Sequence, residues 1–161
     1  MNSEFAIRQI LPEDINSIKQ IIDLSFPRFF RFFAAHSLHS EGEVLVSETR
    51  GTVVGFAKLV KFQVGGGKFG CILWLAVHPQ FRRKGIASAL VNAGTERLKE
   101  ERARAVFASV QRRNVASLTV FSKEGFGKMG FLGLWRLFGW RVFKIYEDIW
   151  YAPGEIVLIH S

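Results

Sequence analysis

The sequence has little of several features that define common protein classes. Its single cysteine, Cys71, lies in the apolar run 71–77, so an intrachain disulfide is impossible and we expect a buried, inert thiol. No uninterrupted apolar run approaches the roughly 18 residues that span a bilayer. The first residues also lack the basic and apolar regions of a signal peptide. We therefore expect a cytoplasmic protein, and the length of 161 residues predicts a single domain over 1–161.

Familiar catalytic and metal-binding motifs are missing as well. A Gly-x-Ser-x-Gly elbow and a Walker sequence are both absent, which removes the commonest hydrolase and nucleoside-triphosphatase interpretations. His36 and His39 lack the acidic partner and the second cysteine that complete a zinc site. We predict no metal.

Positive charge and aromatic side chains are present in excess. There are 22 Lys and Arg against 14 Asp and Glu, a surplus that favours nucleic acid, anionic lipid or a multiply phosphorylated cofactor as partner. The 16 Phe and 4 Trp gather in residues 26–33 and 126–150. These clusters predict a substrate groove, the face of a possible homodimer or a large aromatic core.

Hydrophobic periodicity in the first half predicts a strand, two helices and an antiparallel meander. Pro12, Glu13 and Asp14 open a helix with isoleucines on one face, and Pro27 begins a second helix. The predicted strands are 5–10, 44–48, 52–62 and 69–77.

The second half is typical of a crossover unit, in which a helix connects two parallel strands. Apolar residues at helical spacing follow a glycine-containing loop, and the β-prone run 105–110 then rejoins the sheet in parallel with 69–77. Asn114 caps a helix that ends before Gly125, and 155–160 is a final strand. These elements predict an α/β fold with a mixed sheet.

The segment most informative about chemistry is 82–87, with the sequence Arg-Arg-Lys-Gly-Ile-Ala. It lies where a strand ends and a helix begins, so unpaired backbone N–H groups and the positive end of the helix dipole converge there. Gly85 lets the main chain approach a pyrophosphate closely, and the three basic residues add charge. The segment predicts a pyrophosphate cradle.

Here the sequence resembles the GNAT superfamily of acetyl-coenzyme A dependent N-acetyltransferases. Arg82, Gly85 and Ala87 satisfy that family's signature, the strand 73–79 looks like its fourth strand, and Asn114 precedes Gly125-Phe126 at the family's separation. The resemblance implies a mixed, mostly antiparallel sheet with a splayed parallel strand pair, flanked by about four helices.

The resemblance also implies a reaction. Acetyl-coenzyme A would be the cosubstrate, and a primary amine of a small molecule or protein would attack it directly. The Val77 N–H would stabilise the oxyanion, and backbone groups of Leu75 and Val77 would bind the pantetheine arm. The implied cofactor-binding residues are Leu75, Ala76, Val77, Arg82, Arg83, Lys84, Gly85, Ile86, Ala87, Asn114 and Phe121.

The sequence departs from the family pattern at the proton-transfer groups. Phe121 stands where many relatives carry a tyrosine that protonates the departing thiolate, so the general acid is unassigned. The general base is unassigned too. The candidates for the acid are Tyr146, Tyr151 and Ser122, and those for the base are His78, Glu41 and Glu43.

These departures leave two other functions open. A non-catalytic acyl-coenzyme A binding module would keep the cradle without turnover. Nucleic-acid binding through the basic surplus ranks last, because the cofactor accounts for part of that charge, and we expect no nucleic-acid partner.

Residues 127–150 permit two structures. Apolar residues recur at helical spacing with Arg136, Arg141 and Lys144 between them, which would suit an amphipathic helix at a membrane surface. Gly133 and Gly139 argue against such a helix, and the family resemblance implies strands here instead, which would fill the core, wall the acceptor groove and set substrate specificity. We expect strands.

Overall fold

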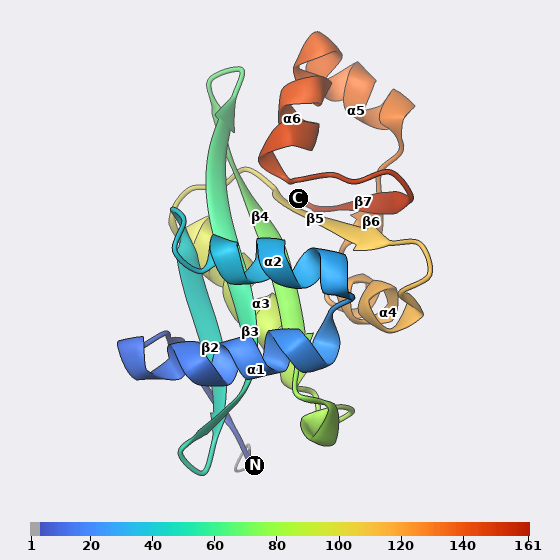
Figure 1. Cartoon of the computed structure of the whole chain (residues 1–161). Helices are drawn as coiled ribbons and strands as arrows, with labels where there is room; N and C mark the ends of the chain where they lie inside the picture. The colour runs from blue at the N-terminus through green and yellow to red at the C-terminus, as the bar shows by residue number, and fades with distance from the viewer. Residues whose placement is uncertain (1–3) are drawn as a thin grey trace. The chain divides into compact units, whose positions relative to one another are not determined.

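The computed structural model describes residues 4–161 (Figure 1). These residues form two compact units. Unit 1 holds the described residues up to Leu59 together with Trp74–Gly94, and unit 2 holds Val60–Leu73 and Thr95–Ser161. The elements in chain order are β1 (Ala6–Gln9), η1 (Pro12–Asp14), α1 (Ile15–Ser25), α2 (Arg28–Ser37), β2 (Glu43–Thr49), β3 (Thr52–Val64), β4 (Gly67–Val77), η2 (Pro79–Phe81), α3 (Ile86–Glu100), β5 (Val106–Gln111), α4 (Val115–Lys123), β6 (Gly127–Lys128), α5 (Phe131–Phe138), η3 (Gly139–Arg141), α6 (Val142–Asp148) and β7 (Glu155–His160).

The strands form a mixed sheet in the hydrogen-bonded order β1-β2-β3-β4-β5-β7-β6. The pairs β1–β2, β2–β3, β5–β7 and β6–β7 are antiparallel. β4 and β5 are parallel, with Gly70 opposite Val106 and Cys71 opposite Phe107. The predicted α/β fold with a parallel strand pair in a mostly antiparallel sheet is therefore confirmed.

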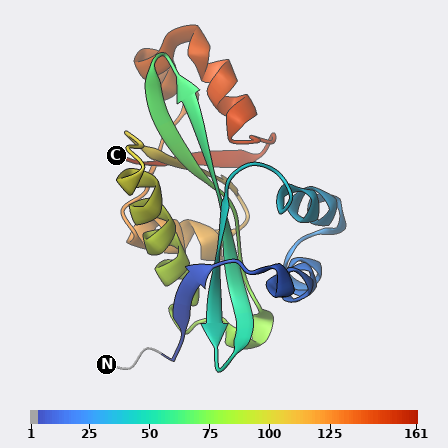
Figure 2. The ribbon, with the colours of Figure 1, turned by 90° about the vertical axis from the view of Figure 1, so that its left-hand side faces the viewer.

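The core of unit 1 forms because α1 has the isoleucine stripe predicted from its spacing. Ile18, Ile21 and Ile22 are buried and pack with Ala34 of α2 and Phe56 of β3. Figures 1 and 2 show α1 and α2 on one face of these strands and the start of α3 on the other.

A close approach fixes the start of α3 in unit 1. A Cβ at Gly55 of β3 would lie 3.1 Å from the Ala76 carbonyl oxygen and 3.3 Å from Ile86 Cγ2. Glycine therefore lets the first turn of α3 pack directly on the sheet. The same turn follows the loop 82–87.

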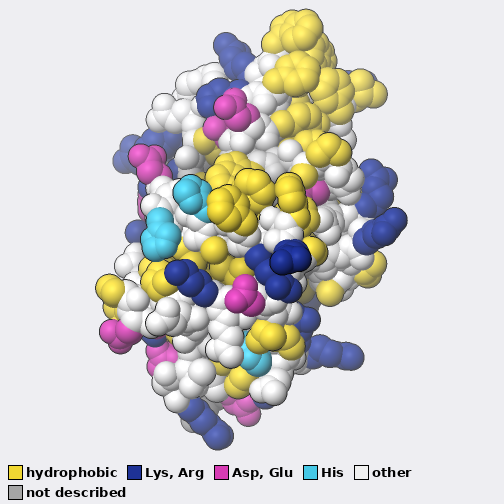
Figure 3. All heavy atoms as spheres, viewed as in Figure 1, with side chains coloured by type: hydrophobic (Ala, Val, Ile, Leu, Met, Phe, Trp, Pro, Cys, Tyr) yellow, Lys and Arg dark blue, Asp and Glu magenta, His cyan; other side chains and the backbone are white. Residues whose placement is uncertain are grey.

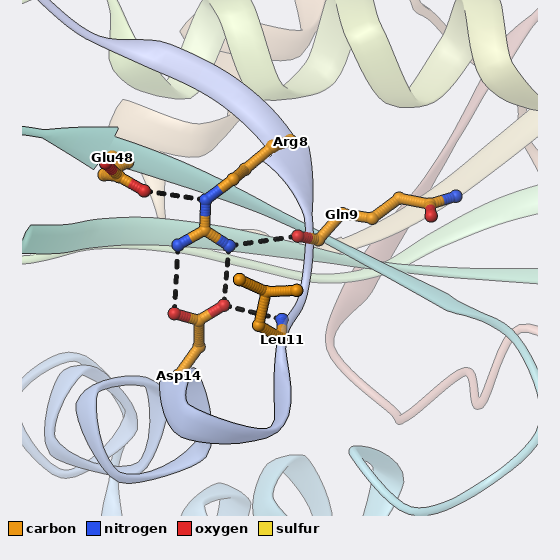
Figure 4. Close-up of polar contacts among 5 residues, drawn as sticks. All are labelled: Arg8, Gln9, Leu11, Asp14 and Glu48. Carbon is orange, nitrogen blue, oxygen red and sulfur yellow. Dashed lines mark hydrogen bonds and ion pairs between the residues drawn. The ribbon is translucent and has the colours of Figure 1, made fainter. Parts of the chain in front are cut away.

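An ion-pair cluster ties the entry of α1 to the edge of the sheet (Figure 4). The Arg8 guanidinium donates to both oxygens of Asp14 at 2.7 and 3.0 Å and to Glu48 at 2.7 Å. Asp14 also accepts from the Leu11 N–H at 2.7 Å. The hydrogen bond from Arg8 holds the pKa of Asp14 below its usual value.

Unit 2 has a separate core beneath α5 and α6. Phe62, Cys71 and Phe107 of the strands are buried with Leu134 of α5 and Ile145 of α6. Cys71 is fully buried, and this burial raises its thiol pKa, as expected for a thiol that contributes only packing.

The strands expected over 127–150 are wrong. Only Gly127–Lys128 form a strand, and α5, η3 and α6 occupy the rest. These additional helices also take residues 4–161 to six α-helices, above the four or so expected.

Both glycines that argued against a helix fit the helical structure. Gly139 has φ +57° and ends α5, so it divides the helical segment without preventing it. A Cβ at Gly133 would lie 2.5 Å from Met129 Sδ, so this glycine makes room for a neighbouring side chain.

Candidate functional site

The loop between β4 and α3 is open and has an unusual backbone. Arg82, Arg83, Lys84 and Gly85 are exposed. Gly85 has φ +81° with nothing within 4 Å of the position of a Cβ, and Arg83 has φ +64°. Two positive φ values so close together turn the chain sharply into α3, whose first N–H groups have no intrahelical acceptor. The arrangement suits an anion.

The two ends of this loop are fastened within unit 1. Arg82 Nε donates to the Val77 carbonyl oxygen at 3.0 Å, and its NH2 donates to Ser25 Oγ at 3.4 Å. The Gly85 carbonyl accepts from the Ala89 N–H at 3.0 Å. Arg82 therefore joins the loop to the end of β4, while Arg83 and Lys84 extend the positive charge of the exposed loop.

The backbone of β4 has a defined orientation at its end. The His78 N–H donates to the Val54 carbonyl of β3 at 2.7 Å. Because N–H groups alternate between the two sides of a strand, those of Val77 and Leu75 point away from β3. Ala76, between them, is buried in the unit 1 core.

An aromatic wall stands beside these residues, and the sequence did not reveal it. The Trp74 ring lies 5.3 Å from Phe26 and 6.2 Å from Phe30 between ring centroids. Trp74 directly precedes Leu75 in β4. An apolar surface therefore lies next to Leu75 and Val77, the residues that the resemblance assigns to the pantetheine arm. The Phe-rich composition of 26–33 was the available signal, but it does not specify which rings meet β4.

Asn114 and Phe121 lie in unit 2. Asn114 Oδ1 accepts from the Ser117 N–H at 3.1 Å, which makes it the N-cap of α4. Phe121 is buried and its ring meets Phe126 edge-on at 5.0 Å. Phe121 therefore has a packing role, and its ring supplies no proton.

The candidate general acids of unit 2 differ in their surroundings. Tyr146 and Tyr151 stack with centroids 4.6 Å apart, and burial raises the pKa of Tyr146. Ser122 is exposed.

The candidate bases lie in unit 1. His78 Nδ1 accepts from the Gln80 N–H at 3.2 Å and caps η2, while the Glu43 carboxylate accepts from Gln9 at 2.5 Å. Glu41 is exposed. His78 and Glu43 thus already make structural contacts.

Residues 4–161 contain neither a cluster of metal-ligand side chains nor a membrane-spanning helix. No three His, Cys, Asp or Glu side chains in this part of the chain come together where they could hold a metal ion. None of the helices there combines the length and apolar character that a membrane crossing requires.

The mixed sheet with its parallel pair, and the glycine turn that leads from β4 into α3, define a GNAT-like fold. Residues 8–126 match the sequence model of the acetyltransferase (GNAT) family, so the chain belongs to that family and is an acyltransferase. Family members use acetyl-coenzyme A.

Sequence and structural comparisons agree with this assignment. The chain is 30% identical over 135 residues to an N-alpha-acetyltransferase of Sulfurisphaera tokodaii, covering 76% of this chain and 80% of that protein. It shares its fold with the PaiA N-acetyltransferase of Thermoplasma acidophilum in complex with coenzyme A, with a TM-score of 0.72, 13% identity and 98% of each chain covered.

A third match is to part of a much larger protein. The glucosamine N-acetyltransferase region of a fungal multi-domain β-N-acetylglucosaminidase has a TM-score of 0.69 and 19% identity. The match covers 80% of this chain and 18% of the fungal chain. This likeness therefore concerns the shared fold alone.

Proposed function

We propose that the chain transfers an acetyl group from acetyl-coenzyme A to a primary amine of a protein or small molecule by direct attack. The observation that carries this proposal is the loop 82–87, where an exposed glycine with positive φ has open space around it and basic side chains beside it. This geometry fits a pyrophosphate.

In this proposal, the N–H groups of Arg83, Lys84, Gly85 and Ala87 hold the pyrophosphate, with Ile86 beginning the helix behind them. Arg83 and Lys84 neutralise its charge. Arg82 acts through position, because its hydrogen bond to the Val77 carbonyl fixes the loop against β4.

The end of β4 would support the chemical step. Leu75 and Val77 direct N–H groups away from β3, where they can bond the pantetheine arm. The thioester supplies the electrophilic carbonyl, and the Val77 N–H donates to its oxygen as the amine attacks. Losing one such backbone donor typically costs about 10²- to 10³-fold in rate.

Phe121 sets an expected ceiling on the rate. Without a tyrosine hydroxyl to protonate it, the coenzyme A sulfur leaves as a thiolate. The pKa of the corresponding thiol is about 8.5. Losing one general acid typically costs about 10²- to 10⁴-fold, so we expect slow but measurable turnover.

The aromatic wall suggests the acceptor. Trp74, Phe26 and Phe30 form an apolar surface beside Leu75, and the relative in S. tokodaii is an N-alpha-acetyltransferase. We infer that the acceptor is the α-amino group of a polypeptide whose first side chain is apolar. A substrate screen in which only polyamines or aminoglycosides react would contradict this.

Calorimetric titration of acetyl-coenzyme A tests the cradle. In Gly85→Glu the carboxylate would face the pyrophosphate, and we expect about a 100-fold loss of affinity because juxtaposed like charges cost several kcal/mol. Gly51→Glu is the matched control, since Gly51 has φ +78° and equally open surroundings in the turn between β2 and β3. The proposal fails if wild type does not bind, or if both variants lose affinity equally.

A non-catalytic acyl-coenzyme A binding module is the second candidate, favoured by the buried Phe121. Release of the free thiol with peptide acceptors separates the two functions. Turnover that depends on the peptide supports the transferase, whereas tight binding without thiol release supports the module.

A further inference from the structure

The helical hairpin α5–η3–α6 in unit 2 exposes a concentration of large apolar side chains. Leu132 is 73% exposed, Leu137 62% and Trp140 76%, and Phe131 and Phe143 are exposed beside them. The yellow side chains at the upper right of Figure 3 lie over these helices. Isolated apolar residues are normal on a protein surface, but a cluster of this kind indicates an interaction site.

The exposed residues are not part of the core. Leu134 of α5 and Val142 and Ile145 of α6 already fill the inward positions and are fully buried. The hairpin is therefore apolar on both its inner and its outer face, which a surface helix ordinarily avoids.

Ring contacts make the outer face continuous. Trp140 lies 4.7 Å from Trp135 and 6.1 Å from Phe143, and Phe143 lies 6.3 Å from Phe131, all between ring centroids. Leu132 and Leu137 add aliphatic surface. We call these exposed residues, Phe131, Leu132, Leu137, Trp140 and Phe143, the hairpin face.

Arginines beside the hairpin face favour an anionic occupant. Arg136, Arg141 and Lys144 are exposed. Lys144 donates to Asp148 at 2.9 Å and also lies near the exposed carboxylate of Glu147, so Arg136 and Arg141 supply the positive field. A second copy of this chain fits less well, because a twofold contact would place the arginines of both copies in one apolar interface. Nucleic acid fits less well too, because aliphatic leucine side chains gain little from phosphates.

We propose that the hairpin face docks on the surface of an anionic lipid bilayer. Leu132, Leu137 and Trp140 enter the boundary between headgroups and acyl chains, while Arg136 and Arg141 contact lipid phosphates. Tryptophan is the residue that favours this boundary. The docking is independent of acetyl transfer and would hold the enzyme at a membrane surface without crossing it.

Sedimentation with lipid vesicles tests the proposal on the full chain. We expect binding to phosphatidylcholine vesicles that contain phosphatidylserine, about tenfold weaker binding to phosphatidylcholine alone, and a decrease with added salt. The variant Leu132→Ser/Leu137→Ser/Trp140→Ser should lose at least about tenfold in partitioning. Arg136→Gln/Arg141→Gln should lose the preference for phosphatidylserine.

The matched control is Phe29→Ser/Phe32→Ser on α2. These phenylalanines are 70% and 69% exposed in unit 1, so the variant removes similar apolar surface elsewhere. It should partition as wild type does. Because every substituted side chain is exposed, circular dichroism should show that all three variants stay folded. Loss of the ring contact between Trp140 and Trp135 should lower the unfolding midpoint of the hairpin variant only slightly.

Several results would overturn the proposal. The proposal is wrong if wild type does not bind phosphatidylserine vesicles, or if the α2 control loses as much partitioning as the hairpin variant does. A dimer in light scattering that the hairpin variant dissociates would assign the face to a second copy. Binding to a single-stranded oligonucleotide that phosphatidylserine vesicles do not displace would assign it to nucleic acid.

Discussion

Exposed arginines lie both in the loop 82–87 and beside the hairpin face, yet the surroundings of the two sets differ. Beside Arg83 and Lys84 lie a glycine with open space and the N-terminus of α3. Beside Arg136 and Arg141 lie Trp140 and two exposed leucines. The first setting is polar, and the second is apolar.

This difference teaches that charge alone does not identify a partner. A net charge of +8 is compatible with nucleotides, lipids and nucleic acids. In the two proposals, backbone N–H groups would select a compact phosphate at the loop, whereas exposed Trp and Leu would select a boundary between water and hydrocarbon at the hairpin.

Charge reversal should separate the two surfaces and gives the largest expected effect. Arg83→Glu/Lys84→Glu should weaken acetyl-coenzyme A binding by about 30-fold or more, because the new carboxylates would repel the phosphates. Vesicle binding should stay unchanged. Arg136→Glu/Arg141→Glu should do the reverse, since each basic residue near an anionic membrane contributes about 1 kcal/mol.

Calorimetry and vesicle sedimentation on the same preparations measure both effects. If either double variant weakens the binding of acetyl-coenzyme A and of vesicles equally, the comparison fails. The surplus positive charge would then attract both anionic ligands without a specific site for either.

A second prediction concerns charges that have partners within the chain. Asp14→Asn should lower the free energy of unfolding by about 2 kcal/mol at neutral pH, because Arg8 then loses a charged acceptor. Glu13→Gln is the control, since Glu13 is exposed on the same turn and should matter little.

The lowered pKa of Asp14 determines how its contribution to stability changes with pH. Arg8 lowers the folded-state pKa of Asp14, so this stabilisation is present above the unfolded pKa of about 3.9. It is lost as the pH falls through the lowered folded pKa. Urea unfolding should therefore show the gap between wild type and Asp14→Asn narrowing below about pH 4, and a constant gap would contradict the ion pair.

The sequence predicted the loop better than the hairpin for a physical reason. Positive φ at Gly85 depends on local backbone freedom, which a glycine at the start of a helix reports directly. The helices of residues 127–150 were harder to predict, because two glycines interrupt the apolar periodicity and the family resemblance implied strands, and the role of Gly133 depends on where the Met129 side chain lies. Backbone freedom follows from the identity of one residue, whereas the role of Gly133 requires knowing which side chain it contacts.

Lys58 shows the same limit within a correctly predicted strand. It is almost fully buried, and its Nζ donates to the Ser40 carbonyl at 3.0 Å. Burial lowers its pKa. Alternation along β3 gave no sign of this, because the carbonyl acceptor lies 18 residues away in the chain.

The hairpin itself can be tested through Gly139. Its φ of +57° and ψ of −137° lie in a region that residues with a Cβ rarely adopt. Gly139→Ala should therefore cost about 1–2 kcal/mol of unfolding free energy, although nothing lies within 4 Å of the Cβ position. Unfolding by urea measures the cost. An unchanged midpoint would mean that the junction between α5 and η3 relaxes freely.

The smallest effect concerns Asn114, which caps α4 and for which the family resemblance also predicts a cofactor contact. Asn114→Ala should lose about 1 kcal/mol of unfolding free energy, and Asn114→Ser should recover it because serine keeps a cap acceptor. Serine lacks the amide, so if Asn114 also binds the cofactor, Asn114→Ser should weaken acetyl-coenzyme A binding by about threefold to tenfold. Wild-type affinity in Asn114→Ser would leave Asn114 a cap alone.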